Sequence, residues 1–491
     1  MMTKRFVTIM VSIFMIVSTI PMSISANTEG YYTYAVENGE VTIVNVNTLI
    51  QGDVEIPDIL GGYPVTKIGD GAFFRCSNLI NVTIPDSIVS IGNSAFKECS
   101  QLEGVVIPNG ITSISDETFS SCYMLKYVSL PDSVISIGYG AFSQCLSLTG
   151  IIIPENVTSI GNMAFYSCAE INSITIPDGV IKLNDALFQG CVKLAQVNIP
   201  EGVTSIGESS FWGCTSLETI DLPNSLISIG HCAFRECTGL KSITIPDSVT
   251  SIGESVFNDC NNLESVILPA EITSMGALFH NCSNLKSVRI PEGVTTINAY
   301  SFYSCDNLES VNIPKSVTTI VFNAFDGCFS LNEVFYGGSK SNWEKINIGT
   351  CNDALNSVEK FHYDSTDPQN HKIITETSEP SCTVPGRTTH TCSNNCFSIE
   401  EIIPPKGHNY IEDVCSVCGN EKPPYIPGDA SDDGVVNLSD VTLLLQSIAK
   451  WDVTLNNDAA DVNCDGTVNL SDVTLLLQYI AKWNVTLGKQ A

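Results

Sequence analysis

Apolar and polar residues along most of the chain follow a pattern that repeats every 23 residues. One unit runs from Leu79 to Cys99 and can be written LxxVxIPxxVxxIGxxAFxxC. Its alternating first part predicts a short strand with one face turned inward, and the proline that follows ends the strand. The remainder predicts a turning segment. Because one unit cannot bury its own apolar face, we expect about twelve units to stack as rungs of a solenoid, with a parallel sheet ~55 to 60 Å long.

Cysteines mark this repeat, with a spacing of 23 that is broken once by 22. We interpret their column as a small buried hydrophobe in the same inward slot of every rung. Disulfides between adjacent rungs are the alternative. Catalysis is disfavoured, because the pattern supplies no histidine partner for a thiolate. Twelve of the 20 cysteines belong to the column: Cys76, Cys99, Cys122, Cys145, Cys168, Cys191, Cys214, Cys237, Cys260, Cys282, Cys305 and Cys328.

The outward strand positions should carry any binding function of the solenoid. Most are small and neutral, whereas a sugar-binding platform would need several aromatic side chains in a row. We expect a hydroxyl-rich surface that binds an unknown protein or glycan, or nothing. One column is Thr83, Val106, Ser129, Ile152, Thr175, Asn198, Asp221, Thr244, Ile267, Arg289 and Asn312. Its neighbour is Asn81, Gly104, Tyr127, Gly150, Ser173, Gln196, Thr219, Ser242, Ser265, Ser287 and Ser310.

The units resemble the bacterial, BspA-type class of leucine-rich repeat, in which IP follows the strand and AFxxC closes the unit. The resemblance covers residues 31–363, with an N-terminal half unit in residues 54–65 and a C-terminal cap in residues 335–363. It implies a mainly β and irregular solenoid. What it implies about function is broad, because such repeats serve as adhesins, protein-binding surfaces and spacers.

The repeat ends after Tyr363, where a Pro, Ser, Thr and Asn-rich linker begins. Two close cysteine pairs follow, Cys392 with Cys396 and Cys415 with Cys418, and approach the spacing of a four-thiolate zinc ribbon. Zinc, disulfides and free thiols all stay open for this module, which resembles a Cys/His-rich module of Gram-positive surface proteins. Four protein ligands would leave no position for water, so any zinc would be structural.

Residues 429–440 and 461–472 are near copies that lie 32 residues apart. Oxygen-bearing side chains at positions 1, 3, 5, 9 and 12, a backbone carbonyl at position 7 and glycine at position 6 are what a calcium loop requires. Apolar residues at i, i+3, i+4 and i+7 predict a helix after each loop. The expected ligands of the two calcium ions are Asp429, Ser431, Asp433, Val435, Asn437 and Asp440, then Asp461, Asn463, Asp465, Thr467, Asn469 and Asp472.

A loop followed by a helix, twice and without entering helices, resembles a type I dockerin over residues 427–487. The resemblance implies an all-α calcium-binding module that docks into a cohesin of a scaffoldin, in a cellulosome-like complex for polysaccharide degradation. Either half could dock after a half-turn, because the two present the same residues. A calcium-stabilised cap with no partner is the alternative. The cohesin-facing residues implied are Leu438, Ser439, Gln446, Lys450, Leu470, Ser471, Gln478 and Lys482.

The N-terminus carries Lys4 and Arg5, an apolar run and then small residues, which is typical of a secretory signal peptide; a retained anchor is the alternative. No later stretch reaches the ~18 apolar residues of a membrane span. A formal charge of −30 disfavours binding to nucleic acid or anionic lipid. We therefore divide the chain into a signal peptide (1–26), a repeat solenoid (27–363), a linker with the Cys/His module (364–426) and a dockerin (427–491). We expect it to be secreted, on the cell surface or in a cellulosome.

Catalytic motifs are missing from the sequence: it has no HExxH, no GxSxG and no phosphate-binding glycine loop. Acidic residues in the repeats, such as Asp86 and Asp132, stand at turns, where solvated charges belong. We expect a non-catalytic interaction protein. An adhesin, or an inhibitor of hydrolases or proteases anchored through the dockerin, is the alternative.

Overall fold

The computed structural model describes residues 26–381, 384–393, 396–406, 410–411, 414–416, 426–450, 453–463 and 467–480. The expected signal peptide lies outside these residues, apart from Ala26. The chain divides into two compact units. One extends to Lys372 and includes Cys392–Phe397; the other contains Ile373–Thr391 and the chain from Ser398 onward. We describe each by itself.

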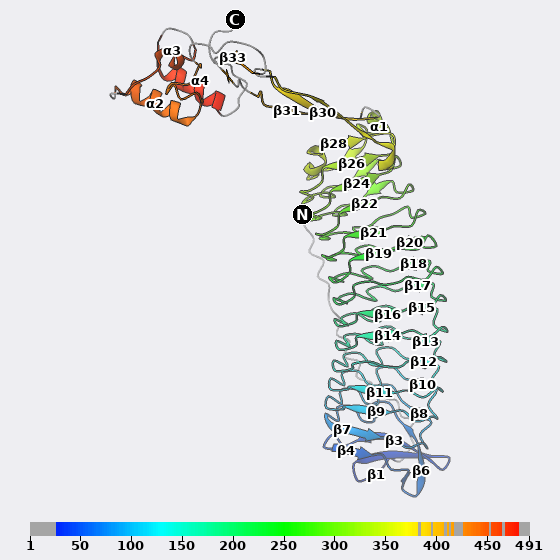
Figure 1. Ribbon diagram of the computed structural model, residues 1–491. Helices are drawn as coiled ribbons and strands as arrows, with labels where there is room; N and C mark the ends of the chain where they lie inside the picture. The colour runs from blue at the N-terminus through cyan, green and yellow to red at the C-terminus, as the bar shows by residue number, and fades with distance from the viewer. Residues whose placement is uncertain are drawn as a thin grey trace, which may run out of the picture. The chain divides into compact units, whose positions relative to one another are not determined.

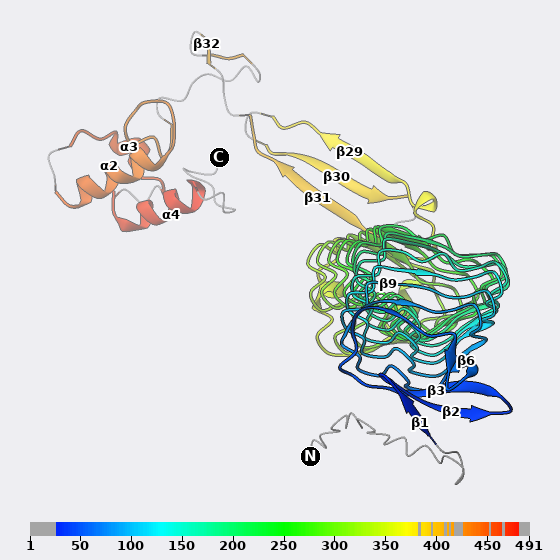
Figure 2. The ribbon, with the colours of Figure 1, turned by 90° about the horizontal axis from the view of Figure 1, so that it is seen from below.

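The 23-residue repeats of the first unit form successive coils that stack on one another (Figures 1 and 2). Most coils contribute a strand to one face, and neighbouring strands pair in parallel, so that Ser173 lies beside Gln196, one repeat later. These strands are β4 (Gln51–Glu55), β7 (Asn78–Thr83), β9 (Gly104–Val106), β11 (Tyr127–Ser129), β14 (Ser173–Thr175), β16 (Gln196–Asn198), β19 (Ser242–Thr244), β21 (Ser265–Ile267), β22 (Ser287–Arg289), β24 (Ser310–Ile313), β26 (Glu333–Tyr336) and β28 (Lys360–His362).

This strand face is not the single continuous sheet that we expect from the sequence. Residues 150–152 and 219–221 occupy strand positions of their rungs but form no strand. The face is therefore divided into a sheet from β4 to β11, the pair β14 and β16, and a sheet from β19 to β28. The coils nevertheless stack without a break in the buried core.

A second column of strands lies in the part of the repeat for which the sequence predicts only a turning segment. Most of these strands have two residues, too few to show an alternating pattern. They are β6 (Tyr63–Ile68), β8 (Ser90–Ile91), β10 (Ser113–Ile114), β12 (Ser136–Ile137), β13 (Ser159–Ile160), β15 (Lys182–Leu183), β17 (Ser205–Ile206), β18 (Ser228–Ile229), β20 (Ser251–Ile252), β23 (Thr296–Ile297), β25 (Thr319–Ile320) and β27 (Asn347–Ile348).

The AFxxC part of the repeat turns sharply at two left-handed residues. In one rung these are Ser94, with a φ of 53°, and Glu98, with a φ of 62°. Glycine takes the second of these positions in other rungs, as at Gly190 and Gly213. Glycine has no Cβ to clash in this region, so it adopts the turn without strain.

Two ladders run through the core. Phenylalanine rings from Phe73 to Phe325 stack rung upon rung, with centroids 4.8 to 5.9 Å apart. The repeat cysteines lie beside them, buried and unbridged. From Cys99 onward, each thiol donates a hydrogen bond to a phenylalanine carbonyl of the previous rung, at 3.1 to 3.3 Å. The interpretation of these cysteines as buried core residues is confirmed.

Caps cover the two ends of the solenoid. The N-terminal cap is built from β1 (Asn27–Glu29), β2 (Tyr32–Glu37) and β3 (Glu40–Val46), which are antiparallel, and β3 then pairs in parallel with β6. A short strand, β5 (Ile59–Leu60), adds to its edge. Near the other end lie α1 (Lys340–Trp343) and the 3-10 helices η1 (Asp353–Asn356) and η2 (Pro368–Asn370).

Among its described residues, the second unit holds short strands and three helices. An antiparallel sheet is formed by β29 (Ile373–Ser378), β30 (Gly386–Cys392) and β31 (Ser398–Ile403), and β32 (Tyr410–Ile411) pairs with β33 (Val414–Cys415). The helices are α2 (Leu438–Ile448), α3 (Asn457–Ala460) and α4 (Leu470–Ile480). The expectation that no helix enters the second loop is wrong, because α3 precedes it. Among the described residues, no helix has both the length and the apolar character needed to cross a membrane.

Candidate functional site

The twelfth residue of each predicted calcium loop is a buried aspartate that ties the loop together. Asp440 accepts a hydrogen bond on Oδ1 from the backbone N–H of Ser431, at 3.0 Å, and on Oδ2 from that of Asn437, at 2.8 Å. Asp472 accepts bonds from the backbone N–H groups at the same two positions of its loop, at 3.2 and 2.9 Å. Both carboxylates therefore face the inside of their loops.

The first residue of the first loop is also turned inward. Asp429 accepts hydrogen bonds from the backbone N–H groups of Asp433, at 3.0 Å, and Gly434, at 2.7 Å, and from the hydroxyl of Ser431, at 3.2 Å. The sharp turn at Gly434, with a φ of 87°, lets the loop close over this carboxylate. In the second loop, Asp465, the counterpart of Asp433, lies outside the described residues.

These loops fit a calcium ion. Asp429, Asp440 and Asp472 are at most 1% exposed. Within the described part of the chain, none of the three forms an ion pair with a lysine or arginine. A buried carboxylate without a cation is costly, and oxygen ligands around a tight glycine turn are what calcium selects. Three of the predicted ligands, Asp429, Asp440 and Asp472, are thus turned into their loops, and the remaining ligands stay a prediction.

The ninth residue of each loop joins the loop to its helix. Asn437 accepts a hydrogen bond on Oδ1 from the backbone N–H of Ser439, at 2.8 Å, and Asn469 does the same with Ser471. Asn437 is therefore the N-cap of α2, and with Asp440 it forms a reciprocal capping box. Ordering the loop consequently orders the first turn of the helix that follows it.

The helix surface separates into a buried face and an exposed face. Val441 and Leu444 of α2 pack in one core with their counterparts on α4, Val473 and Leu476. The predicted apolar anchors point outward instead: Leu438 is 60% exposed and Leu470 is 61% exposed.

The other predicted docking residues are exposed or half-buried, apart from one that the structure does not describe. Ser439, Ser471 and Lys450 are exposed, and Gln446 and Gln478 are half-buried. Lys482 lies outside the described residues.

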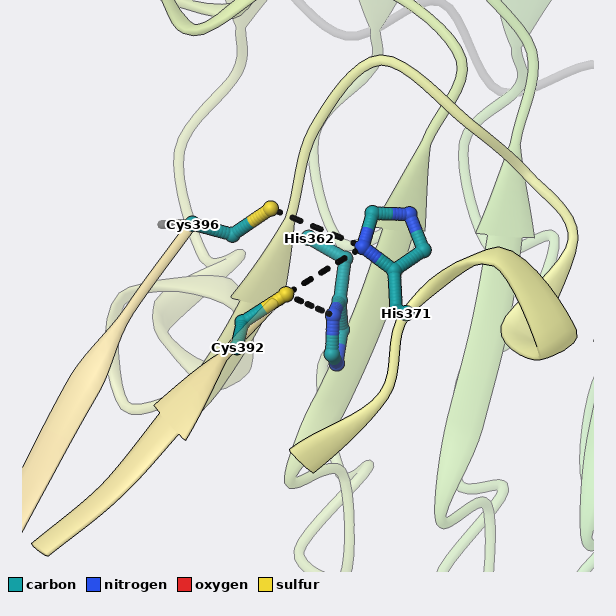
Figure 3. A group of neighbouring side chains, drawn as sticks. All are labelled: His362, His371, Cys392 and Cys396. Atoms are coloured by element: carbon teal, nitrogen blue, oxygen red, sulfur yellow. Dashed lines mark hydrogen bonds between the residues drawn. The ribbon is translucent and has the colours of Figure 1, made fainter. Parts of the chain in front are cut away.

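Cys392 and Cys396 lie together with two histidines that the zinc prediction does not include (Figure 3). Cys392 Sγ is 3.4 Å from His371 Nδ1 and 3.7 Å from His362 Nδ1, and Cys396 Sγ is 3.5 Å from His371 Nδ1. Of the other predicted pair, Cys418 lies outside the described residues, and the structure describes only the backbone of Cys415.

His362 and His371 come from the end of the solenoid. His362 is the last residue of β28, and His371 follows η2. Their nine-residue spacing has no motif of its own, and sequence analysis assigns His362 to the cap. Two histidines within the 30 residues before a close cysteine pair are the signal that could have found the cluster.

Most positions in the outward columns of the strand face are exposed as predicted, and Asn81, Gly150, Ser310 and Asn312 are half-buried. Ile152 is 87% exposed, Ile267 62% and Tyr127 54%. Gly104 is an exception: it is buried, because the ring of Tyr127 lies over it in the neighbouring rung, so close that an added Cβ would lie 2.0 Å from the ring. The face therefore offers isolated apolar side chains among small polar ones.

A solenoid of short coils that stack parallel strands on a common face is a leucine-rich repeat fold. The chain belongs to the BspA-type leucine-rich repeat family: models of the BspA type Leucine rich repeat region match residues 53–172, 136–227, 158–278, 204–332 and 276–384. The C-terminal loops and helices form a type I dockerin domain, whose model matches residues 427–481.

Solved structures of bacterial leucine-rich repeat proteins are similar to this chain. One from Bacteroides ovatus is 34% identical, with a TM-score of 0.58, over 68% of this chain and 90% of that one. A leucine rich cell surface protein from Faecalibacterium prausnitzii is 31% identical, with a TM-score of 0.42, over 66% and 98% of the two chains. A leucine-rich repeat protein of T. pallidum is 32% identical, with a TM-score of 0.37, over 39% and 91%. No curated protein is similar enough to count as a relative.

Leucine-rich repeats and dockerins are typically non-catalytic, and proteins that carry them are typically extracellular or surface-associated. Type I dockerins bind calcium and partner with cohesins. The two kinds of domain together indicate an interaction protein.

Proposed function

We propose that this protein is a secreted, non-catalytic adaptor. Its dockerin, loaded with two calcium ions, docks to a cohesin of a scaffoldin, and its solenoid presents a binding surface for a protein or glycan. The complex is cellulosome-like, lies on or near the cell and takes part in polysaccharide degradation.

The observation that supports docking most directly is the exposure of the same leucine in both halves of the dockerin. Leu438 and Leu470 each begin a helix and stay more than half exposed, while the apolar residues one turn later are buried. A single exposed leucine is ordinary, but a repeated one at the start of each helix marks a surface that a partner covers. Calcium orders this surface through the caps at Asn437 and Asn469.

Binding of the full-length protein to the cohesins encoded in the same genome tests the docking. We expect binding in calcium and its loss with a chelator, since the loops set the helix starts. Strontium or calcium added back should restore binding. Failure to bind any of these cohesins in calcium, or undiminished binding in chelator, would contradict the proposal.

The proposed ligand surface of the solenoid is its strand face. Short polar side chains such as Ser242, Ser265 and Ser287 line it in successive rungs, which suits hydrogen bonding to an extended partner. Capture of purified mucin, plant cell-wall polymers or culture-supernatant proteins by the full chain tests this part. Replacing Ser242 and Ser287 by arginine should abolish capture, whereas arginines on the opposite side of the coil should not.

A further inference from the structure

The spacing of the four side chains at the end of the solenoid matches a tetrahedral metal site. With a Zn–S bond of ~2.3 Å and a Zn–N bond of ~2.0 Å, a sulfur and a nitrogen ligand of tetrahedral zinc lie about 3.5 Å apart. The three sulfur to nitrogen distances here are 3.4, 3.5 and 3.7 Å, and all four ligand atoms lie within 4.8 Å of one another.

Both imidazoles are already turned so that Nδ1 can bind a metal. His362 places Nε2 3.0 Å from a carboxylate oxygen of Glu333, and His371 places Nε2 3.3 Å from the carbonyl oxygen of Ser365. Each oxygen accepts the Nε2 proton and so leaves the Nδ1 lone pair facing the cysteines. A carboxylate or carbonyl behind the ligating histidine is the usual outer support of a zinc site.

The surroundings of the sulfurs suit thiolates held by a metal. Cys396 Sγ accepts a hydrogen bond from the backbone N–H of Tyr363, at 3.3 Å. Cys392 is fully buried, and His362 and His371 are 1% and 7% exposed.

We propose that Cys392, Cys396, His362 and His371 bind one zinc ion as a structural Cys2His2 site. Two thiolates and two imidazoles in a compact tetrahedral set favour zinc over the oxygen-seeking calcium of the dockerin. The site has four protein ligands and no open position, so it supports structure and not catalysis. It differs from the four-cysteine ribbon that the sequence predicts.

The zinc joins the last strand of the solenoid to the turn that follows β30. β28 is the final strand of its sheet, and such an edge needs cover. The described residues at the two ends of this turn supply that cover. Cys396 Sγ accepts a hydrogen bond from the backbone N–H of Tyr363, and the backbone N–H of Ser393 donates to the carbonyl oxygen of Lys372, at 2.7 Å. The ion thus acts as a C-terminal clamp on the stack of rungs.

Metal analysis of the full-length protein, purified under reducing conditions and loaded with zinc in the presence of calcium, tests the proposal. We expect one tightly bound zinc per chain. His371→Gln should weaken zinc binding by about 100-fold or more, since losing a ligand costs at least as much as losing an outer-shell partner. Cys351→Ser is the matched control, because Cys351 is free and exposed, and should bind zinc normally. Cys415→Ser and Cys418→Ser should also bind normally.

X-ray absorption at the zinc edge of the unmutated protein gives an answer that does not depend on a variant folding. We expect two sulfur and two nitrogen ligands. Four sulfurs, or zinc that survives His371→Gln but not Cys415→Ser, would overturn the proposal in favour of the four-cysteine site. A Cys392–Cys396 disulfide in the protein as secreted, or no zinc uptake after reduction, would also overturn it.

Discussion

The thiol of Cys145 donates a hydrogen bond to the carbonyl oxygen of Phe119, 3.2 Å away and one rung earlier. The same bond recurs along the stack. Each of these carbonyls also accepts a backbone N–H bond from the cysteine of its own rung, as Phe119 does from Cys122 at 3.2 Å, so the thiol is its second donor. The repeated cysteine therefore fills the core and finds a partner for its own S–H within it.

The column cysteines should be unreactive in the folded protein. They are buried, whereas Cys351 is exposed and Cys232 is partly exposed. An aromatic disulfide reagent should therefore modify Cys351 first in native protein and the twelve column thiols only after denaturation. Rapid labelling of most column cysteines under native conditions, or the finding of only two or three thiols in denaturant, would contradict the buried, reduced ladder.

The solenoid should lose stability at alkaline pH. Burial raises the pKa of Cys122 and of Cys191 from 9.0 to about 12. Between these values the unfolded thiol has lost its proton and the folded one has kept it, so stability is full below pH 9.0 and falls as pH rises toward 12. The slope is about 1.4 kcal/mol per pH unit for each thiol.

Thermal melting from neutral pH to pH 10.5 measures this decline, because the range covers the constant stability below pH 9.0 and part of the fall above it. A variant with both Cys122→Ala and Cys191→Ala should show a shallower decline, although its starting stability is lower. An unchanged melting temperature up to pH 10.5 would contradict this prediction, because it would show that folding does not raise the pKa of these thiols.

Removing one ring from the phenylalanine ladder should destabilise the solenoid strongly. Phe165 stacks between Phe142 and Phe188, with centroids 5.7 Å from each. Phe165→Ala should cost about 3 to 5 kcal/mol, because it leaves a cavity in the middle of the stack. Phe329→Ala is the matched control, since Phe329 is 87% exposed and should cost almost nothing. Chemical denaturation of both variants makes the comparison, and equal costs would contradict it.

The second calcium loop should bind more tightly than the first. Its third position is Asn463, whose amide carbonyl is a better ligand for calcium than the hydroxyl of Ser431. Asp461→Ala should therefore remove the stronger calorimetric binding event and Asp429→Ala the weaker one. A larger loss of affinity from Asp429→Ala would reverse the order.

The two halves of the dockerin should dock in two equivalent ways. Leu438→Asp alone or Leu470→Asp alone should reduce cohesin affinity only about twofold, roughly 0.4 kcal/mol, because the other half remains available. The double variant should lose several kcal/mol of binding free energy. Tight binding by the double variant would contradict the assignment of these leucines, while loss of binding in one single variant would leave a single docking mode.

Much of this protein follows from local pattern. The 23-residue period places one cysteine and usually one phenylalanine in every rung, and stacking alone then predicts the buried column. The loops from Asp429 to Asp440 and from Asp461 to Asp472 are equally local, since twelve consecutive residues supply each set of ligands. Sequence analysis could thus assign both the repeat fold and the dockerin.

Tertiary structure decided the features that join distant residues or have too few residues to show a pattern. The two-residue strands such as β8 and β10 exist only because neighbouring coils pair them. His362 and His371 meet Cys392 and Cys396 because the last rung and the turn after β30 come together, although 30 residues separate His362 from Cys392. A periodic signal reports which face of an element is buried, but it carries no information on which separate segments meet, and that depends on how the chain folds back on the end of the solenoid.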